Sequence, residues 1–108
     1  MAAVAAPVYS TKGGTVILGE INQVQKPVVK HAKATGWVAW KMKIEGINGC
    51  SDYWFFKDGH LLIMEFKATD KEPNAQQVRR HKELREAGFE VHVIDDPARG
   101  IELLDAWS

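Results

Sequence analysis

Three charged side chains, Asp52, Glu65 and Lys67, are spaced so that they could act together. Glu65 and Lys67 lie two residues apart in a segment that reads as a strand, so both project from the same face of a sheet. An Asp58-Gly59 pair between two apolar runs predicts a tight hairpin turn. Antiparallel pairing about this turn brings residue 52 near residue 65. Two carboxylates and one ammonium are therefore expected to meet at one end of the hairpin.

This combination of side chains suits the binding of a metal ion. Burying charged groups is costly unless they are paired or hold a metal. Two carboxylate oxygens at one point suit a hard divalent cation such as Mg²⁺. A lysine beside them could stabilise an anion or position a water molecule. The sequence thus predicts a site for a divalent cation at the end of the hairpin.

The elements that must position these groups alternate between helix and strand. We expect strands at 53–57, 61–67, 37–43 and 90–94, and helices at 16–35, from Pro73 to about Ala87, and at 98–107. Pro27 should kink the first helix or start a new one. The helix between strands 61–67 and 90–94 acts as a crossover, which implies that these two strands pair in parallel. The predicted fold class is α/β, with the order α-β-β-β-α-β-α and helices on the faces of a mixed sheet.

Segment 37–43 alternates between two kinds of side chain. One face carries Trp37, Ala39, Lys41 and Lys43, and the other carries Val38, Trp40 and Met42. The second face is apolar, so we expect it in the core. Lys41 is either an exposed solubilising residue or a contact to a phosphate group.

The helix from Pro73 to about Ala87 is polar and largely basic. Ala75, Val78, Leu84 and Ala87 form a thin apolar stripe. Two interpretations stay open: a solvated amphipathic helix, or a helix whose first turns face the hairpin. In the second, Gln77 reaches the site and the basic residues, among them Arg79 and Arg80, meet phosphate groups.

The length and composition limit the classes of protein to which the chain can belong. A chain of 108 residues predicts one domain, with residues 1–15 as an N-terminal arm and 16–108 as the folded unit. Lys+Arg and Asp+Glu number 14 each, so net charge gives no indication of a nucleic-acid partner. The single cysteine, Cys50, excludes an internal disulfide and suits a reducing compartment. No apolar run approaches the ~20 residues that span a membrane. The first residues make a poor signal peptide, so a cytoplasmic location is expected.

Other ionisable residues are weaker candidates. His31, His60, His81 and His92 are scattered over different elements, and surface or core positions are preferred to a zinc site. Glu20, early in the first helix, is either a solvated acid or a third carboxylate ligand.

An Asp, a hairpin and then Glu-x-Lys make up a pattern that resembles the PD-(D/E)xK nuclease superfamily. Within it the chain looks like a stand-alone VRR-NUC domain of phage or bacterial type, over about residues 16–106. The matching residues are Lys41, Gly49, Asp52, Glu65, Lys67, Gln77, Leu84 and Gly88. Ser51 stands where the family has proline, and Glu20 aligns only to within about one residue.

The resemblance implies a restriction-endonuclease-like αβββαβ core and a DNA nuclease that depends on Mg²⁺ or Mn²⁺. Asp52, Glu65 and the Phe66 carbonyl would hold the metal, with Glu20 as a further ligand. Lys67 would position the water or stabilise the reacting phosphate, and Gln77 would orient either. Candidate DNA contacts are Lys41, Lys43, Arg79 and Arg80. Small stand-alone relatives form homodimers and favour branched DNA such as four-way junctions.

The competing interpretation is a nuclease-like fold that binds DNA or a protein without cutting. A degenerate site of that kind would lack Asp52, Glu65 or Lys67, and all three are present. A sequence-specific restriction enzyme is less favoured because such enzymes carry additional recognition segments.

Overall fold

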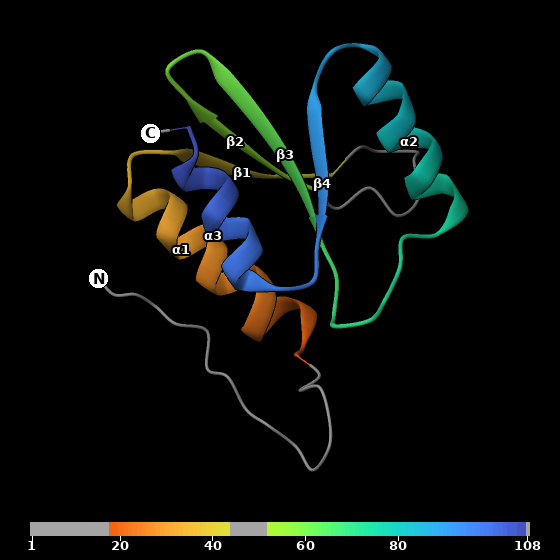
Figure 1. Cartoon of the computed structure of the whole chain (residues 1–108), viewed down its shortest axis with the longest axis horizontal. Coiled ribbons are helices and arrows are strands. Elements are labelled where there is room, and N and C mark those ends of the chain that lie inside the picture. Colours follow the sequence, from red (N-terminus) through yellow and green to blue (C-terminus); the bar gives the residue numbers. More distant parts are fainter. Residues whose placement is uncertain (1–17, 44–51, 108) are drawn as a thin grey trace.

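A four-stranded mixed sheet forms the centre of the protein (Figure 1). The computed structural model describes residues 18–43 and 52–107. The expected arm at 1–15 and the residues Gly49, Cys50 and Ser51 lie outside this range. The strands are β1 (Val38–Met42), β2 (Asp52–Lys57), β3 (His60–Phe66) and β4 (Glu90–Ile94), and they lie in the order β1-β2-β3-β4.

Helices cover both faces of this sheet. A π-helical turn, η1 (Glu20–Gln25), leads into α1 (Lys26–Ala34), followed later by α2 (Ala75–Glu86) and α3 (Pro97–Asp105). Pro27 lies in the first turn of α1, so it starts a new helix as expected. Helices α1 and α3 lie side by side, whereas α2 connects β3 to β4 on the other side of the sheet (Figure 1). The element order and the α/β class predicted from the sequence are confirmed. No helix in the described ranges is long and apolar enough to cross a membrane.

The β2–β3 hairpin forms in the predicted register. Tyr53 pairs with Met64 and Lys57 with His60 in antiparallel fashion. Asp58 and Gly59 both have positive φ, at 50° and 81°. A two-residue turn of this type matches the twist of the flanking strands and requires positive φ at both positions, which Asp-Gly adopts readily.

Strand β3 then pairs in parallel with β4, as the crossover predicts. Leu62 pairs with Glu90 and Phe66 with Ile94. Just beyond β3, the Lys67 amide donates to the Ile94 carbonyl at 2.8 Å. Strand β3 is thus paired with β2 as far as Met64 and with β4 as far as Phe66, which fixes the position of Glu65.

The two faces of β3 lie in different environments. Leu62, Met64 and Phe66 point into the apolar core beneath α1 and α3. Alternation places Ile63 and Glu65 on the opposite face, toward α2. The main core therefore forms on one face of the sheet, and a charged residue is buried on the other.

The prediction that Val38, Trp40 and Met42 form the core face of β1 is wrong. Val38 and Trp40 are 50% and 57% exposed, whereas Trp37 is buried and Ala39 packs against the core. The register explains the reversal, because Ala39 pairs with Phe55, which lies in the core beneath α1. The aromatic side chain of Trp40 instead packs against Phe56 with ring centroids 5.0 Å apart.

Most of the apolar stripe of α2 is exposed. Val78 is 52% exposed, and Ala75 and Ala87 are exposed as well. The buried residues of the helix are polar: Gln77, Arg80 and His81. The physical reason is that the sheet face beneath α2 carries buried carboxylates, so this helix contributes polar partners as well as apolar ones.

Helices α1 and α3 approach closely at Gly100, and this contact yields a stability prediction. A Cβ atom at Gly100 would lie 2.8 Å and 3.0 Å from the two γ-carbons of Val28. Alanine in a helix ordinarily stabilises by about 0.5–1 kcal/mol relative to glycine. Here we expect Gly100→Ala to destabilise, by about 1–3 kcal/mol, because overpacking exceeds the gain in helix propensity. Urea unfolding measures this change.

The matched control is the double variant Val28→Ala/Gly100→Ala. Removing the clashing methyl groups should make the Gly100→Ala change neutral or stabilising in the Val28→Ala background. An equal cost in both backgrounds would contradict steric contact as the cause.

Candidate metal centre

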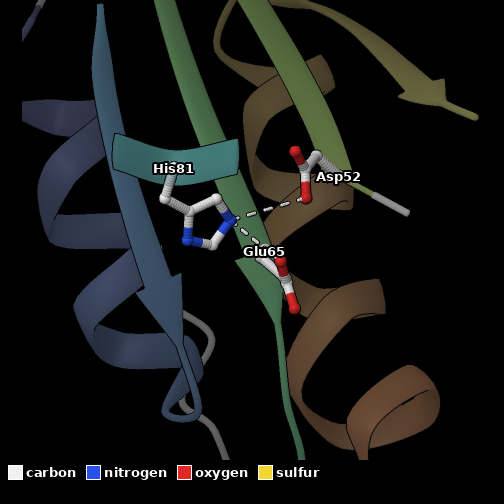
Figure 2. A group of neighbouring side chains, drawn as sticks. All are labelled: Asp52, Glu65 and His81. Carbon is white, nitrogen blue, oxygen red and sulfur yellow. Dashed lines mark ion pairs between the residues drawn. The ribbon is translucent and has the colours of Figure 1, made fainter. Parts of the chain in front are cut away.

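Three buried side chains from three different elements meet on the α2 face of the sheet (Figure 2). Asp52 is the first residue of β2, Glu65 lies near the end of β3, and His81 comes from α2. One donor atom from each lies within 4.8 Å of the other two. Their exposed fractions are 1%, 1% and 2%. These residues form the Asp52–Glu65–His81 cluster.

The hairpin register brings the two carboxylates together. Tyr53 pairs with Met64, so Asp52 and Glu65, one residue further along each strand, come opposite one another. Both belong to the same face as Trp54 and Ile63. The predicted approach of residues 52 and 65 is confirmed.

His81 reaches the carboxylates because of the way α2 begins and ends. Asn74 caps the helix: its side chain accepts from the Gln77 amide at 2.9 Å, and the Gln77 side chain accepts from the Asn74 amide at 2.8 Å. This capping box fixes the first turn with Gln77 buried. His81 lies four residues on and therefore on the same face. Near the other end, Arg85 donates to the Val91 carbonyl at 2.8 Å, which ties α2 to β4.

The carboxylate oxygens retain unused hydrogen-bonding capacity. His81 Nε2 lies 2.9 Å from Glu65 Oε1 and 3.9 Å from Asp52 Oδ1, and Lys67 Nζ lies 3.2 Å from Glu65 Oε2. These distances are those of ion pairs, but the contacts do not meet the geometry of a hydrogen bond. Within the described residues, Asp52 Oδ1, both Glu65 oxygens and His81 Nε2 have no hydrogen-bond partner. Buried polar atoms normally have one, so the cluster fits a cation that accepts these lone pairs.

The His81 imidazole carries a positive charge within the cluster at neutral pH. The Asp52 carboxylate, and next that of Glu65, raise the pKa of His81 from 6.5 to about 9, although burial opposes the shift. At neutral pH the imidazolium and the Lys67 ammonium therefore balance two carboxylates. Without this compensation, two buried negative charges side by side would strongly destabilise the fold.

The other residues predicted for the site occupy different positions. Lys67 lies beside Glu65, as expected. Gln77 is buried on the cluster side of α2, and its side-chain oxygen forms the helix cap. The Lys67 amide donates to Ile94 and therefore points toward β4. In a trans peptide the carbonyl and the amide point in opposite directions, so the Phe66 carbonyl points away from β4. It is therefore directed toward the side of β3 on which β2 and Asp52 lie.

The remaining candidates do not join the cluster. Glu20 is half-buried in η1 and is not among the donors that lie within 4.8 Å of one another. Lys41 pairs with Tyr53, so it lies on the sheet face opposite Asp52. Lys43 and Arg79 are exposed, and Arg80 is 8% exposed. The roles predicted for these residues in DNA binding stay predictions.

His81 is the member of the cluster that sequence reasoning missed, since it was assigned to an ordinary surface or core position. A usable signal was present. Once Gln77 is placed toward the site, the helical repeat places residue 81 on the same face, one turn later. His31, His60 and His92 lie elsewhere: His31 contacts Asp105, His60 stacks on Trp107, and His92 contacts Glu90.

The raised pKa of His81 predicts how stability depends on pH. A group whose pKa rises on folding stabilises fully below its unfolded value of 6.5, and that stabilisation is lost as pH rises toward about 9. In the presence of EDTA, we expect the free energy of unfolding to fall between pH 6.5 and 9, by at most about 3 kcal/mol at 1.36 kcal/mol per unit. Urea titrations at several pH values measure this slope.

The variant His81→Gln serves as the control, because glutamine does not titrate. We expect it to be less stable at pH 6.5 and to lose most of the slope between pH 6.5 and 9. An unchanged slope in this variant would assign the pH dependence to other groups.

The chain was also compared with known proteins. No protein-family model matches it, and no curated protein matches it. The site is therefore interpreted from its own residues: two buried carboxylates, a histidine and a lysine on one face of a mixed sheet.

Proposed function

We propose that this protein is a metal-dependent DNA nuclease that hydrolyses phosphodiester bonds. The observation that carries the proposal is the buried pair Asp52 and Glu65, whose oxygens Asp52 Oδ1, Glu65 Oε1 and Glu65 Oε2 have no hydrogen-bond partner within the described chain. A pair of this kind stabilises nothing by itself, since each carboxylate repels the other. Its chemistry matches that of a divalent-cation site.

The roles of the residues follow from their positions. Asp52 and Glu65 would hold the ion, with the Phe66 carbonyl as a further oxygen ligand. A Mg²⁺ or Mn²⁺ ion held there would supply Lewis acidity and positive charge for phosphodiester hydrolysis. Lys67, whose ammonium lies 3.2 Å from Glu65, holds a positive charge beside the reacting phosphate. That charge is more effective here than in water because the Lys67 side chain is only 17% exposed.

The fold gives independent support. The order of strands and helices, with an antiparallel hairpin followed by a parallel crossover strand, is compatible with the αβββαβ core of restriction-endonuclease-like proteins. In that arrangement the acidic residues lie at the start of the second strand and the end of the third, as Asp52 and Glu65 do. The resemblance of the sequence to VRR-NUC domains points to the same class.

The substrate and assembly that we propose follow from this resemblance. Branched DNA, such as a four-way junction, is the proposed substrate, and the protein acts as a homodimer in the cytoplasm. Two symmetric cuts require two active sites, which a two-fold dimer supplies.

A cleavage assay tests the proposal. Linear, single-stranded, flap and four-way DNA substrates are incubated with the protein in Mg²⁺ or Mn²⁺, and products are separated on denaturing gels. We expect cleavage that EDTA abolishes. Glu65→Gln should remove it, and Lys67→Ala should lower the rate by roughly 10²–10³-fold, the range found when one electrostatic contact to a transition state is removed.

Matched controls separate chemistry from folding. Lys71→Ala removes an exposed lysine close in sequence, and Glu86→Gln removes an exposed acid of α2. Both should cleave as the parent does, and circular dichroism should show all variants folded. If the parent binds DNA but cleaves no better than Glu65→Gln, the protein is a binding module with a nuclease-like fold.

A further inference from the structure

His81 is a feature of the site that metal binding through carboxylates alone does not explain. Its ring is 2% exposed, and Nε2 points toward the two carboxylates (Figure 2). That nitrogen has no hydrogen-bond partner within the described residues. A buried imidazole is commonly held by hydrogen bonds to backbone or side chains, whereas this nitrogen is directed at the metal-binding oxygens.

We infer that His81 Nε2 gives up its proton to solvent and binds the metal ion directly, and that the site therefore prefers a transition-metal ion such as Mn²⁺ to Mg²⁺. The inference rests on the proposed function, because it specifies which ion the same site holds. It adds a nitrogen donor to a site otherwise made of oxygen.

The observed distances agree with a shared ion. Ligand bonds of about 2.0–2.3 Å place two donors of one ion between about 3 Å and 4.6 Å apart. His81 Nε2 lies 2.9 Å from Glu65 Oε1 and 3.9 Å from Asp52 Oδ1, both inside or at the edge of this range. All three donors lie within 4.8 Å of one another. Small side-chain adjustments are sufficient for simultaneous binding.

The chemistry of the donors sets the preference. Mg²⁺ is a hard ion that keeps oxygen ligands and several waters. Imidazole binds the first-row transition metals, and for sites with nitrogen and oxygen donors their affinity rises from Mn²⁺ toward Cu²⁺. A set of one imidazole and two carboxylates therefore selects against Mg²⁺, while Mn²⁺ still accepts the octahedral, oxygen-rich surroundings that a phosphate ligand requires.

Electron paramagnetic resonance of the Mn²⁺-loaded protein tests for the ligand directly. Pulsed measurements detect coupling between the Mn²⁺ electrons and a bound ¹⁴N nucleus. We expect this coupling in the parent protein, its replacement by ¹⁵N coupling when histidine is ¹⁵N-labelled, and its loss in His81→Gln. His92→Gln is the matched control, since His92 pairs with Met64 on the other face of the sheet and contacts Glu90, and it should keep the signal. Bound Mn²⁺ without histidine coupling in the parent would overturn the inference, whether or not His81→Gln folds.

Isothermal titration calorimetry provides a second measurement, at one fixed pH. We expect the parent to bind Mn²⁺ at least about tenfold more tightly than Mg²⁺. His81→Gln should lose about 10–100-fold in Mn²⁺ affinity, since even residues that only orient a ligand cost that much when replaced. Mg²⁺ affinity should change less. Equal affinity of the parent for both ions would count against the preference.

The outcomes distinguish this inference from the proposed function. If Glu65→Gln abolishes Mn²⁺ binding and His81→Gln leaves it unchanged, then His81 is only a counter-charge, and the carboxylate site stands. If the parent binds neither ion, both the inference and the proposed metal-dependent chemistry fail.

Discussion

Burying two carboxylates side by side is the constraint on which the rest of this structure depends. Asp52 and Glu65 are 1% exposed and face each other across a hairpin whose register leaves them no alternative position. Their repulsion must be offset from within the fold. His81 and Lys67 supply the two positive charges, one from above the sheet and one from the same strand segment. The placement of α2 over β3 and β4 is thus an electrostatic requirement as much as a packing one.

Much of this arrangement could be predicted from the sequence because the relevant signals are local. Asp58-Gly59 sets the turn, and the turn sets the register that brings residues 52 and 65 together. A helix between two apolar strands requires a parallel crossover, which fixes β4 beside β3. From such short-range rules follow the order of the elements, the mixed sheet and the meeting of two carboxylates with Lys67.

What could not be predicted was the identity of the faces that are buried. Periodicity identifies a buried face by its apolar residues, and here two faces break that rule. Trp40 is exposed although it is aromatic, since the chain here contacts the core through Ala39 of β1 and through Trp37, which directly precedes β1. His81 is buried although it is polar, because α2 lies over carboxylates. Both errors have one cause: the neighbour that a strand or helix meets is decided by tertiary contacts, not by its own pattern.

The stability of the fold does not by itself explain the buried charge. Replacing a buried ionic cluster with apolar side chains of similar volume is often neutral or stabilising. The neighbouring residue Ile63 is apolar and fully buried on the same face, so this environment accepts hydrocarbon. The stability of the fold does not require Asp52, Glu65 and His81 together. The cluster is explained if the free energy it costs in the metal-free protein is recovered when a cation takes up the unused oxygen lone pairs. Stability and metal binding are then linked, because an ion that binds only the folded state stabilises it.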